Sequence, residues 1–330
     1  MVVSPVSASE VVVTCLVLIT LVVVTGLFAA RWVPRHRPPT PESEPPPRAS
    51  RVAFVLSGGS SSGASQVGML ATLVEHGIVP DAIYGTSVGA INAAAFAAQP
   101  SSAGVENLAA IWRQMTRERV FPGHRALTAL HAVRQRPALF PNTGLRSIVE
   151  SGIGTPTFEE MLVPLTVVAT HRTSGREVHV RRGSVVDAVL ASAAIPGVFP
   201  AVEIDGEAYV DGGVTNHVPL APAIADGATE VYVLLASAPP ELVTARTPTR
   251  PLEGLVGALL TAVHRRFPLE LDYVRRLHPQ VSLNVIWPDV TTPVAYNDFS
   301  ATDVLIAAGR RAAQVLLAGS LTDTTVTLRD

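Results

Sequence analysis

The chain contains no lysine: all 25 of its basic residues are arginine. With 27 acidic residues the formal net charge is −2, which does not suggest a nucleic-acid-binding protein. Without lysine the chain cannot form the Gly-x-x-x-x-Gly-Lys phosphate loop of many nucleotide-binding proteins. The arginines are scattered along the sequence, so we attribute the missing lysine to a coding bias rather than to a function.

Cysteine is almost absent as well. The single cysteine, Cys15, lies in an N-terminal apolar run, which excludes an intrachain disulfide and a cysteine zinc site. The nine histidines include no His-x-x-x-His pair of the kind that binds metals. We therefore expect neither a metal nor another cofactor.

The N-terminal segment predicts a membrane anchor. Residues 11–30 are twenty residues without a charge, enough to cross a hydrocarbon layer of about 30 Å as a helix. Arg31, Arg35 and Arg37 follow at once, and this basic flank favours a cytoplasmic position for the rest of the chain. The alternative is a signal peptide, cleaved near the small residues of 27–30, with export of the mature protein.

Three segments follow from these patterns. We expect a single-pass transmembrane anchor over residues 1–31 and a hydrolase domain over 51–320. Between them, residues 32–50 are rich in proline, serine and charge, which is typical of an extended spacer.

The remaining chain alternates short apolar runs with segments of helical periodicity, which predicts a mostly parallel sheet covered by helices on both faces. Residues 120–160 carry mixed signals and are expected to be irregular and partly helical. Ser184 is expected to cap a helix that Pro196 ends. Strands are expected at Val52–Leu56, Ala82–Tyr84, Leu165–Ala169, Val231–Leu235 and Val281–Ile286. Further helices are expected after residue 63, at Ala90–Ala98, through Leu108, Ile111, Trp112 and Met115, and through Leu305, Ala308, Ala312, Val315 and Leu316.

A Gly-x-Ser-x-Gly motif lies between the second expected strand and the next helix. In such a nucleophile elbow the turn is so tight that side chains two residues before and after the serine would collide. Gly85 and Gly89 remove that collision, and the hydroxyl of Ser87 is left above the sheet edge, near the positive end of the following helix. The alternative is an ordinary glycine-rich turn between a strand and a helix, which could have the same sequence.

A glycine-rich loop, Gly58–Gly63, follows the first expected strand. Backbone amides between a strand and a helix bind anions, so the loop is suited either to a phosphate or to the oxyanion of an acyl transfer. Ser60 occupies the middle glycine position of the dinucleotide fingerprint, which weakens the nucleotide-binding alternative. A serine nucleophile nearby favours the oxyanion hole.

Asp211-Gly212-Gly213 follows a short apolar segment. A serine hydroxyl needs a base to take its proton, and a carboxylate at a strand end can reach Ser87 across the sheet edge. A simple Asp-Gly-Gly turn is the alternative.

Together the glycine loop, the elbow and the Asp-Gly-Gly turn resemble, in this order, the patatin-like phospholipase family. The 124 residues between Ser87 and Asp211 also suit that family. Further similarities are Ala64, Gln66, Val67 and Gly68 after the loop, the segment 191–200, and Asn216, Pro219 and Leu220 after the aspartate.

The resemblance implies a metal-free acyl hydrolase. Ser87 would be the nucleophile, Asp211 its base without a histidine, and the amides of Gly58, Gly59 and Ser60 the oxyanion hole. The substrate would be a lipid, with cleavage of fatty acyl esters of the phospholipase A or lysophospholipase type. Gly63, Gly85, Gly89, Gly212 and Gly213 complete the motifs.

Two departures keep other hypotheses open. Ser60 and Ser62 replace a glycine and the basic residue of the family's loop, so a weakly active or inactive lipid-binding protein is one alternative. A Ser-His-Asp esterase is another, because His217 lies six residues after Asp211. His171 and His179 are further candidates for that histidine.

Overall fold

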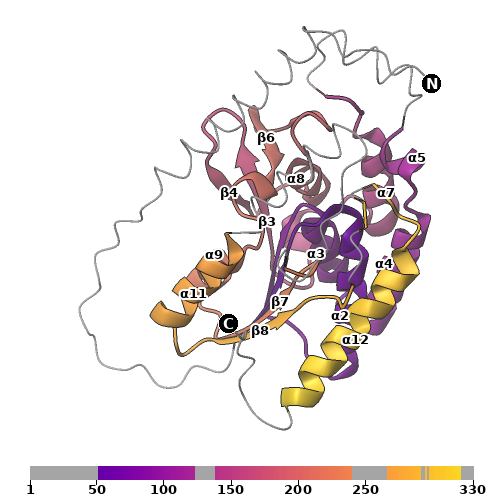
Figure 1. The fold of residues 1–330 in the computed structure, drawn as a ribbon. Helices are drawn as coiled ribbons and strands as arrows, with labels where there is room; N and C mark the ends of the chain where they lie inside the picture. The colour runs from indigo at the N-terminus through magenta and orange to yellow at the C-terminus, as the bar shows by residue number, and fades with distance from the viewer. Residues whose placement is uncertain (1–50, 123–137, 240–265, 291–293, 296, 321–330) are drawn as a thin grey trace, which may run out of the picture. The chain divides into compact units, whose positions relative to one another are not determined.

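The computed structural model describes residues 51–122, 138–239, 266–290, 294–295 and 297–320 (Figure 1). The expected anchor and spacer, residues 1–50, lie outside this part of the chain. Within the described residues, no helix has both the length and the hydrophobicity that a membrane crossing requires. The N-terminal anchor therefore stays a prediction from sequence.

One sheet organises the domain. Its strands form the chain of hydrogen-bonded neighbours β5-β6-β3-β2-β1-β7-β8, and β4 also pairs with β3. The five strands β3-β2-β1-β7-β8 are parallel to one another, whereas β4 and β6 pair antiparallel with β3, and β5 pairs antiparallel with β6. The predicted α/β fold with a mostly parallel sheet is confirmed, and the antiparallel strands make the sheet mixed. The strands are β1 (Val52–Leu56), β2 (Ala82–Thr86), β3 (Leu165–His171), β4 (Glu177–Val180), β5 (Val202–Ile204), β6 (Glu207–Asp211), β7 (Glu230–Leu234) and β8 (Ser282–Ile286).

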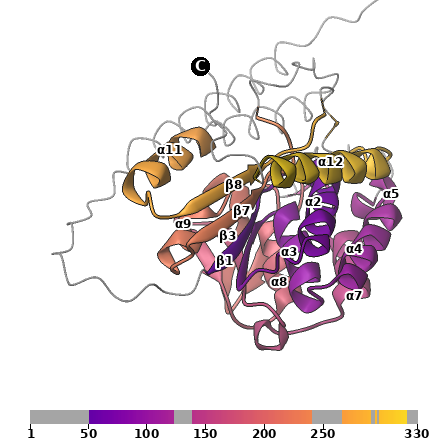
Figure 2. The same ribbon diagram turned by 90° about the horizontal axis from the view of Figure 1, so that it is seen from below.

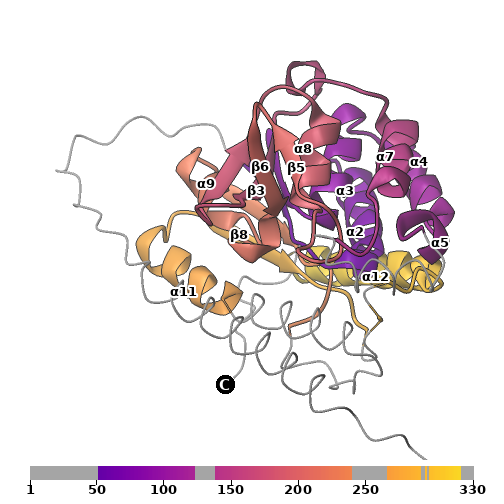
Figure 3. The same ribbon diagram turned by 90° about the horizontal axis from the view of Figure 1, so that it is seen from above.

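Helices cover both faces of the sheet, as Figures 2 and 3 show, with α9 and α11 on one side and α2, α3, α4, α7 and α8 on the other. The helices are α2 (Ala64–Glu75), α3 (Val88–Ala98), α4 (Ser102–Gln114), α5 (Arg117–Val120), α7 (Thr143–Ile153), α8 (Val185–Ser192), α9 (Leu220–Ala225), α11 (Phe267–Leu277) and α12 (Thr302–Ser320). Short 3-10 turns span Ser60–Gly63, Phe158–Glu160 and Gly212–Val214.

The alternation of side chains along the strands divides the core in two. In β1, Phe54 and Leu56 belong to the cluster under α2, α3 and α8, while Ala53 and Val55 belong to the cluster under α9 and α11. Successive strand residues point to opposite faces, so a strand covered on both sides is apolar throughout. This explains why the central strands could be recognised as short apolar runs.

The peripheral elements were harder to predict. β4 alternates half-buried and exposed residues and includes Glu177 and His179. It therefore contains no apolar run from which a strand could be predicted. The region 120–160, expected to be irregular and partly helical, contains the helix α7, and residues 123–137 of it are not described. On α12 the prediction was right for Leu305 and Ala308, which are buried, and wrong for Val315, which is 73% exposed. Ser184 caps α8 as expected, accepting a hydrogen bond from the amide of Asp187.

Two glycines let α2 and α12 pack at very short range. A Cβ on Gly309 would stand 1.8 Å from the carbonyl oxygen of Ser65, and one on Gly68 would stand 1.9 Å from that of Ile306. Both obstacles are backbone atoms that cannot rotate away. The last helix is thereby fixed against the helix that follows the glycine-rich loop.

We expect Gly309→Ala to lower the free energy of unfolding by about 1–3 kcal/mol, because α12 must move away from α2. Urea denaturation measures the change. Gly319→Ala, on the same helix but with no atom within 4 Å of the added methyl, is the matched control and should stay within about 0.5 kcal/mol of wild type. Equal stability of the two variants would contradict the close packing of the helices.

Candidate active site

Ser87 lies between β2 and α3 in a strained turn. Its backbone has φ 54° and ψ −123°, and such conformations cost an L-residue about 1–3 kcal/mol. A Cβ on Gly85 would stand 2.5 Å from the carbonyl oxygen of Gly89, and one on Gly89 would stand 2.3 Å from that of Leu56. The two glycines therefore have the steric role that the elbow motif predicts.

The register of β3 explains how Asp211 reaches this serine. Val168 pairs with Thr86 at the end of β2, and the next residue, Ala169, pairs with Asp211 at the end of β6. On its other side β3 pairs with β4 over the same residues, so β2 and β6 share one side. β2 runs parallel to β3 and β6 antiparallel, so the two strands end against each other. Ser87 and Asp211 meet at that point.

The two side chains are bonded directly and buried. The Ser87 hydroxyl donates to Oδ2 of Asp211 at 2.8 Å, and the amide of Gly213 donates to Oδ1 at 2.7 Å. Asp211 is only 6% exposed, and this burial raises its pKa to about 7, although the bonds from Ser87 and Gly213 lower it. A carboxylate with this pKa is suited to accept and return a proton near neutral pH.

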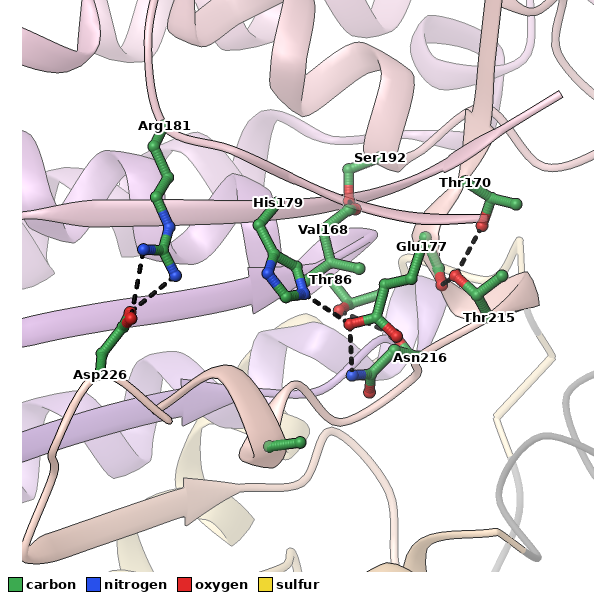
Figure 4. Close-up of polar contacts among 12 residues, drawn as sticks. Thr86, Val168, Thr170, Glu177, His179, Arg181, Ser192, Thr215, Asn216 and Asp226 are labelled. Carbon is green, nitrogen blue, oxygen red and sulfur yellow. Dashed lines mark hydrogen bonds and ion pairs between the residues drawn. The ribbon is translucent and has the colours of Figure 1, made fainter. Parts of the chain in front are cut away.

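The segment after Asp211 is fixed from several directions. Gly212 passes so close to β3 that a Cβ would stand 2.1 Å from the carbonyl oxygen of Val168. The hydroxyl of Thr170 donates to the Asp211 carbonyl at 2.9 Å and lies 2.9 Å from that of Thr215 (Figure 4). The side-chain amide of Asn216 donates to the carboxylate of Glu177 on β4 at 2.9 Å, as Figure 4 also shows. These contacts hold the carboxylate in position.

The glycine-rich loop borders Ser87. A Cβ on Gly58 would stand 3.4 Å from the Cβ of Ser87, which places this residue beside the elbow. The amide of Gly58, however, donates to the carbonyl of His217 at 3.0 Å. This amide, which the sequence predicted as an oxyanion donor, is thus already hydrogen-bonded within the protein. The amide of Gly59 has no acceptor among the described residues.

Ser60 holds the position of the family's third glycine in a left-handed conformation, with φ 52°. That region favours glycine, because the Cβ of other residues crowds the backbone there. The loop thus keeps the glycine-like turn with a serine in it, at some cost in strain.

A buried polar network supports the loop, and sequence reasoning missed it. The Gln66 amide donates to the carbonyl oxygens of Ser57 and Leu234, both at 2.9 Å. The Asn92 amide donates to the carbonyl of Gly63 at 2.9 Å and to the side-chain oxygen of Gln66 at 2.8 Å. The indole of Trp112 donates to Asn92 at 2.8 Å. An asparagine within the alanine-rich run of α3 was the available signal, since buried polar side chains need partners.

None of the three candidate histidines, His171, His179 and His217, stands between Ser87 and Asp211. The ring of His217 is buried against Gly58 and Gly213, beside both candidate residues, while Ser87 and Asp211 touch each other directly. His171 and His179 pair instead with Glu207 and Glu177. In the described part of the chain, no three His, Cys, Asp or Glu side chains gather as a metal site would require.

Relatives of the chain are found among bacterial and animal proteins. It is 30% identical over 172 residues to the uncharacterized NTE family protein Rv1063c of Mycobacterium tuberculosis. The matched residues make up 52% of this chain and 45% of that protein. It is 31% identical over 186 residues to patatin-like phospholipase domain-containing protein 7 of Rattus norvegicus, over 56% of this chain and 13% of that protein. The chain thus spans less than half the length of these curated relatives.

Among solved structures, VipD from Legionella pneumophila is similar with a TM-score of 0.47 and 15% identity, over 82% of this chain and 67% of that one. The family model of the patatin-like phospholipases matches residues 54–224, about half of the chain, from β1 to α9. This stretch includes the glycine-rich loop, the elbow and the Asp-Gly-Gly turn. The chain therefore belongs to the patatin-like phospholipase family.

Proposed function

We propose that the protein hydrolyses fatty acyl esters of lipids, in the manner of a phospholipase A or a lysophospholipase, with Ser87 as nucleophile and Asp211 as base. The observation that carries this proposal is the direct, buried hydrogen bond of 2.8 Å between the two side chains. A serine bonded to a carboxylate of raised pKa has the partner it needs for deprotonation.

The reaction would proceed in two halves. Asp211 takes the hydroxyl proton while Oγ of Ser87 attacks the ester carbonyl, and the protonated Asp211 then gives that proton to the leaving alcohol. In the second half Asp211 takes a proton from water, the resulting hydroxide attacks the acyl-enzyme, and the fatty acid leaves as the proton returns to Ser87. No histidine is required.

The oxyanion of each tetrahedral intermediate needs donors that are not otherwise engaged. Because the Gly58 amide is bonded to the His217 carbonyl, we leave it out of the proposed donors and favour the amide of Gly59. The amide of Ser60 stays a donor proposed from the family resemblance alone. The N-terminus of α3, directly after Ser87, adds a favourable field for negative charge.

We also retain the sequence-based proposals for the rest of the protein: a single-pass anchor over residues 1–31, a spacer over 32–50, a hydrolase domain over 51–320, and a cytoplasmic position for that domain. A lipid substrate close to the bilayer would fit this arrangement.

Ser87→Ala and Asp211→Asn should each lower kcat on a lysophospholipid or a p-nitrophenyl acyl ester by about 10³-fold or more, because they remove the nucleophile or its base. A fluorophosphonate probe should label wild type at Ser87 and leave Ser87→Ala unlabelled.

His217→Gln should keep most of the activity. A loss on the scale of Ser87→Ala in that variant would favour the triad esterase, and no adduct on wild type would favour a lipid-binding protein without turnover.

The strain at Ser87 predicts a difference between two inactive variants. Ser87→Ala and Ser87→Gly both lose the bond to Asp211, but only glycine adopts φ 54° without strain. Ser87→Gly should therefore be the more stable of the two by about 1 kcal/mol, after allowing for the greater flexibility of glycine in the unfolded chain. Chemical denaturation of the pair measures this, and equal stabilities would speak against backbone strain at the elbow.

The raised pKa of Asp211 predicts the pH dependence of the reaction. Only the ionised carboxylate accepts a proton, so kcat/KM should fall as the pH drops through about 7. Burial raises the pKa of Glu270 to about 7 as well, but this residue lies on α11, where it accepts from the amide of Ala221. Glu270→Gln is thus the matched control and should keep the fall of kcat/KM at acidic pH, the acid limb of the pH profile. If Glu270→Gln loses this acid limb, the limb reports the titration of Glu270 and not of Asp211.

A further inference from the structure

The C-terminal end of α8 holds both candidate catalytic residues by their backbones. The amide of Ser87 donates to the hydroxyl oxygen of Ser192, the last residue of α8, at 2.8 Å. Two residues later, the carbonyl of Ala194 accepts from the amide of Asp211 at 2.9 Å. One short segment thus contacts the ends of both strands that meet on β3.

The orientation of the Ser192 hydroxyl is determined by its surroundings. It donates its single proton to the carbonyl of Val168 at 2.5 Å, so only its lone pairs remain to accept from Ser87. Ser192 is fully buried, so water does not compete for either bond. Figure 4 shows Ser192 beside Val168, the β3 residue that pairs with Thr86 directly before the nucleophile.

This contact matters because the Ser87 backbone is strained. A turn with φ 54° and ψ −123° persists only where the surrounding structure fixes it. Among the described residues, the side chain that accepts from the Ser87 amide is Ser192, and Ser87 itself is buried. Without that acceptor the amide would be left buried and unpaired, which favours movement of the turn.

We propose that Ser192 is a positioning residue: its hydroxyl fixes the backbone of Ser87, so that Oγ points at Asp211. The role rests on the proposed function, since it is defined by the attack of Ser87. Ser192 does not touch the reacting atoms, and with Ala194 it keeps the nucleophile and its base in register.

The first measurement is steady-state kinetics on a p-nitrophenyl acyl ester. Ser192→Ala should lower kcat by about 10- to 100-fold with KM within about twofold, because a misplaced nucleophile slows the chemical step more than binding. Ser192→Cys, which keeps a weaker hydrogen-bonding group of similar size, should fall between wild type and Ser192→Ala. The cysteine variant also serves if the alanine variant does not fold.

The matched control is Thr72→Val. Thr72 is also fully buried, and its hydroxyl bonds to backbone carbonyls of Gly68 and Arg310, between α2 and α12. This variant should lose stability comparable to Ser192→Ala and keep kcat within about twofold of wild type. The comparison separates positioning from general loss of stability.

The pH profile gives a second readout. The hydrogen bond from Ser87 lowers the pKa of Asp211, so a displaced Ser87 should move the acid limb of kcat/KM upward by about one pH unit in Ser192→Ala. Thr72→Val should leave the limb in place, because a change in stability alone does not alter the dyad.

The inference is overturned if Ser192→Ala and Ser192→Cys both keep the kcat of wild type, or if the acid limb stays in place while kcat falls only with the folded fraction. Such results leave the proposed function intact as long as wild type turns over and Ser87 takes the fluorophosphonate label. If wild type neither turns over nor is labelled, the proposed function fails and the role of Ser192 fails with it.

Discussion

The site depends on two strands that end against each other along one side of β3. β2 ascends parallel to β3 and stops at Thr86, while β6 descends antiparallel and stops at Asp211 one residue further along. A purely parallel sheet would not bring the ends of two strands together on one side of a third. The antiparallel part of this mixed sheet is therefore what carries Asp211 to a serine 124 residues earlier in the chain.

Such a meeting point leaves little room, and the sequence around it reflects that constraint. Gly85, Gly89 and Gly212 each lie where a Cβ would come within 2.5 Å of a backbone oxygen. The positive φ of Ser87 is a further consequence, because a turn this tight can present the hydroxyl only in a conformation that L-residues avoid. The bonds to Ser192 and Ala194 hold the crowded ends in place.

Burial has the largest effect on the pKa of Asp211. A carboxylate exposed to water has a pKa near 4 and is a weak base at neutral pH. Enclosing Asp211 raises its pKa to about 7, while the bonds from Ser87 and Gly213 keep the ionised form accessible. A buried network of Gln66, Asn92 and Trp112 stabilises the glycine-rich loop. Its hydrogen bonds hold the carbonyls of Ser57 and Gly63 at the two ends of the loop.

Local signals in the sequence were sufficient for the central strands, for most helices and for the identity of the motifs. Apolar runs such as Val52–Leu56 mark strands covered on both faces, and the glycines two residues before and after Ser87 mark a turn that is tight for steric reasons within the motif itself. Contacts between distant segments were decided only by the tertiary structure. They include the direct bond between Ser87 and Asp211, the bond of the Gly58 amide to the His217 carbonyl, the bond of the Ser87 amide to Ser192, and the strand β4 with its exposed face. The physical reason is that the period of a strand or helix is set by neighbouring residues, whereas a hydrogen-bond partner far along the chain is set by how the layers pack.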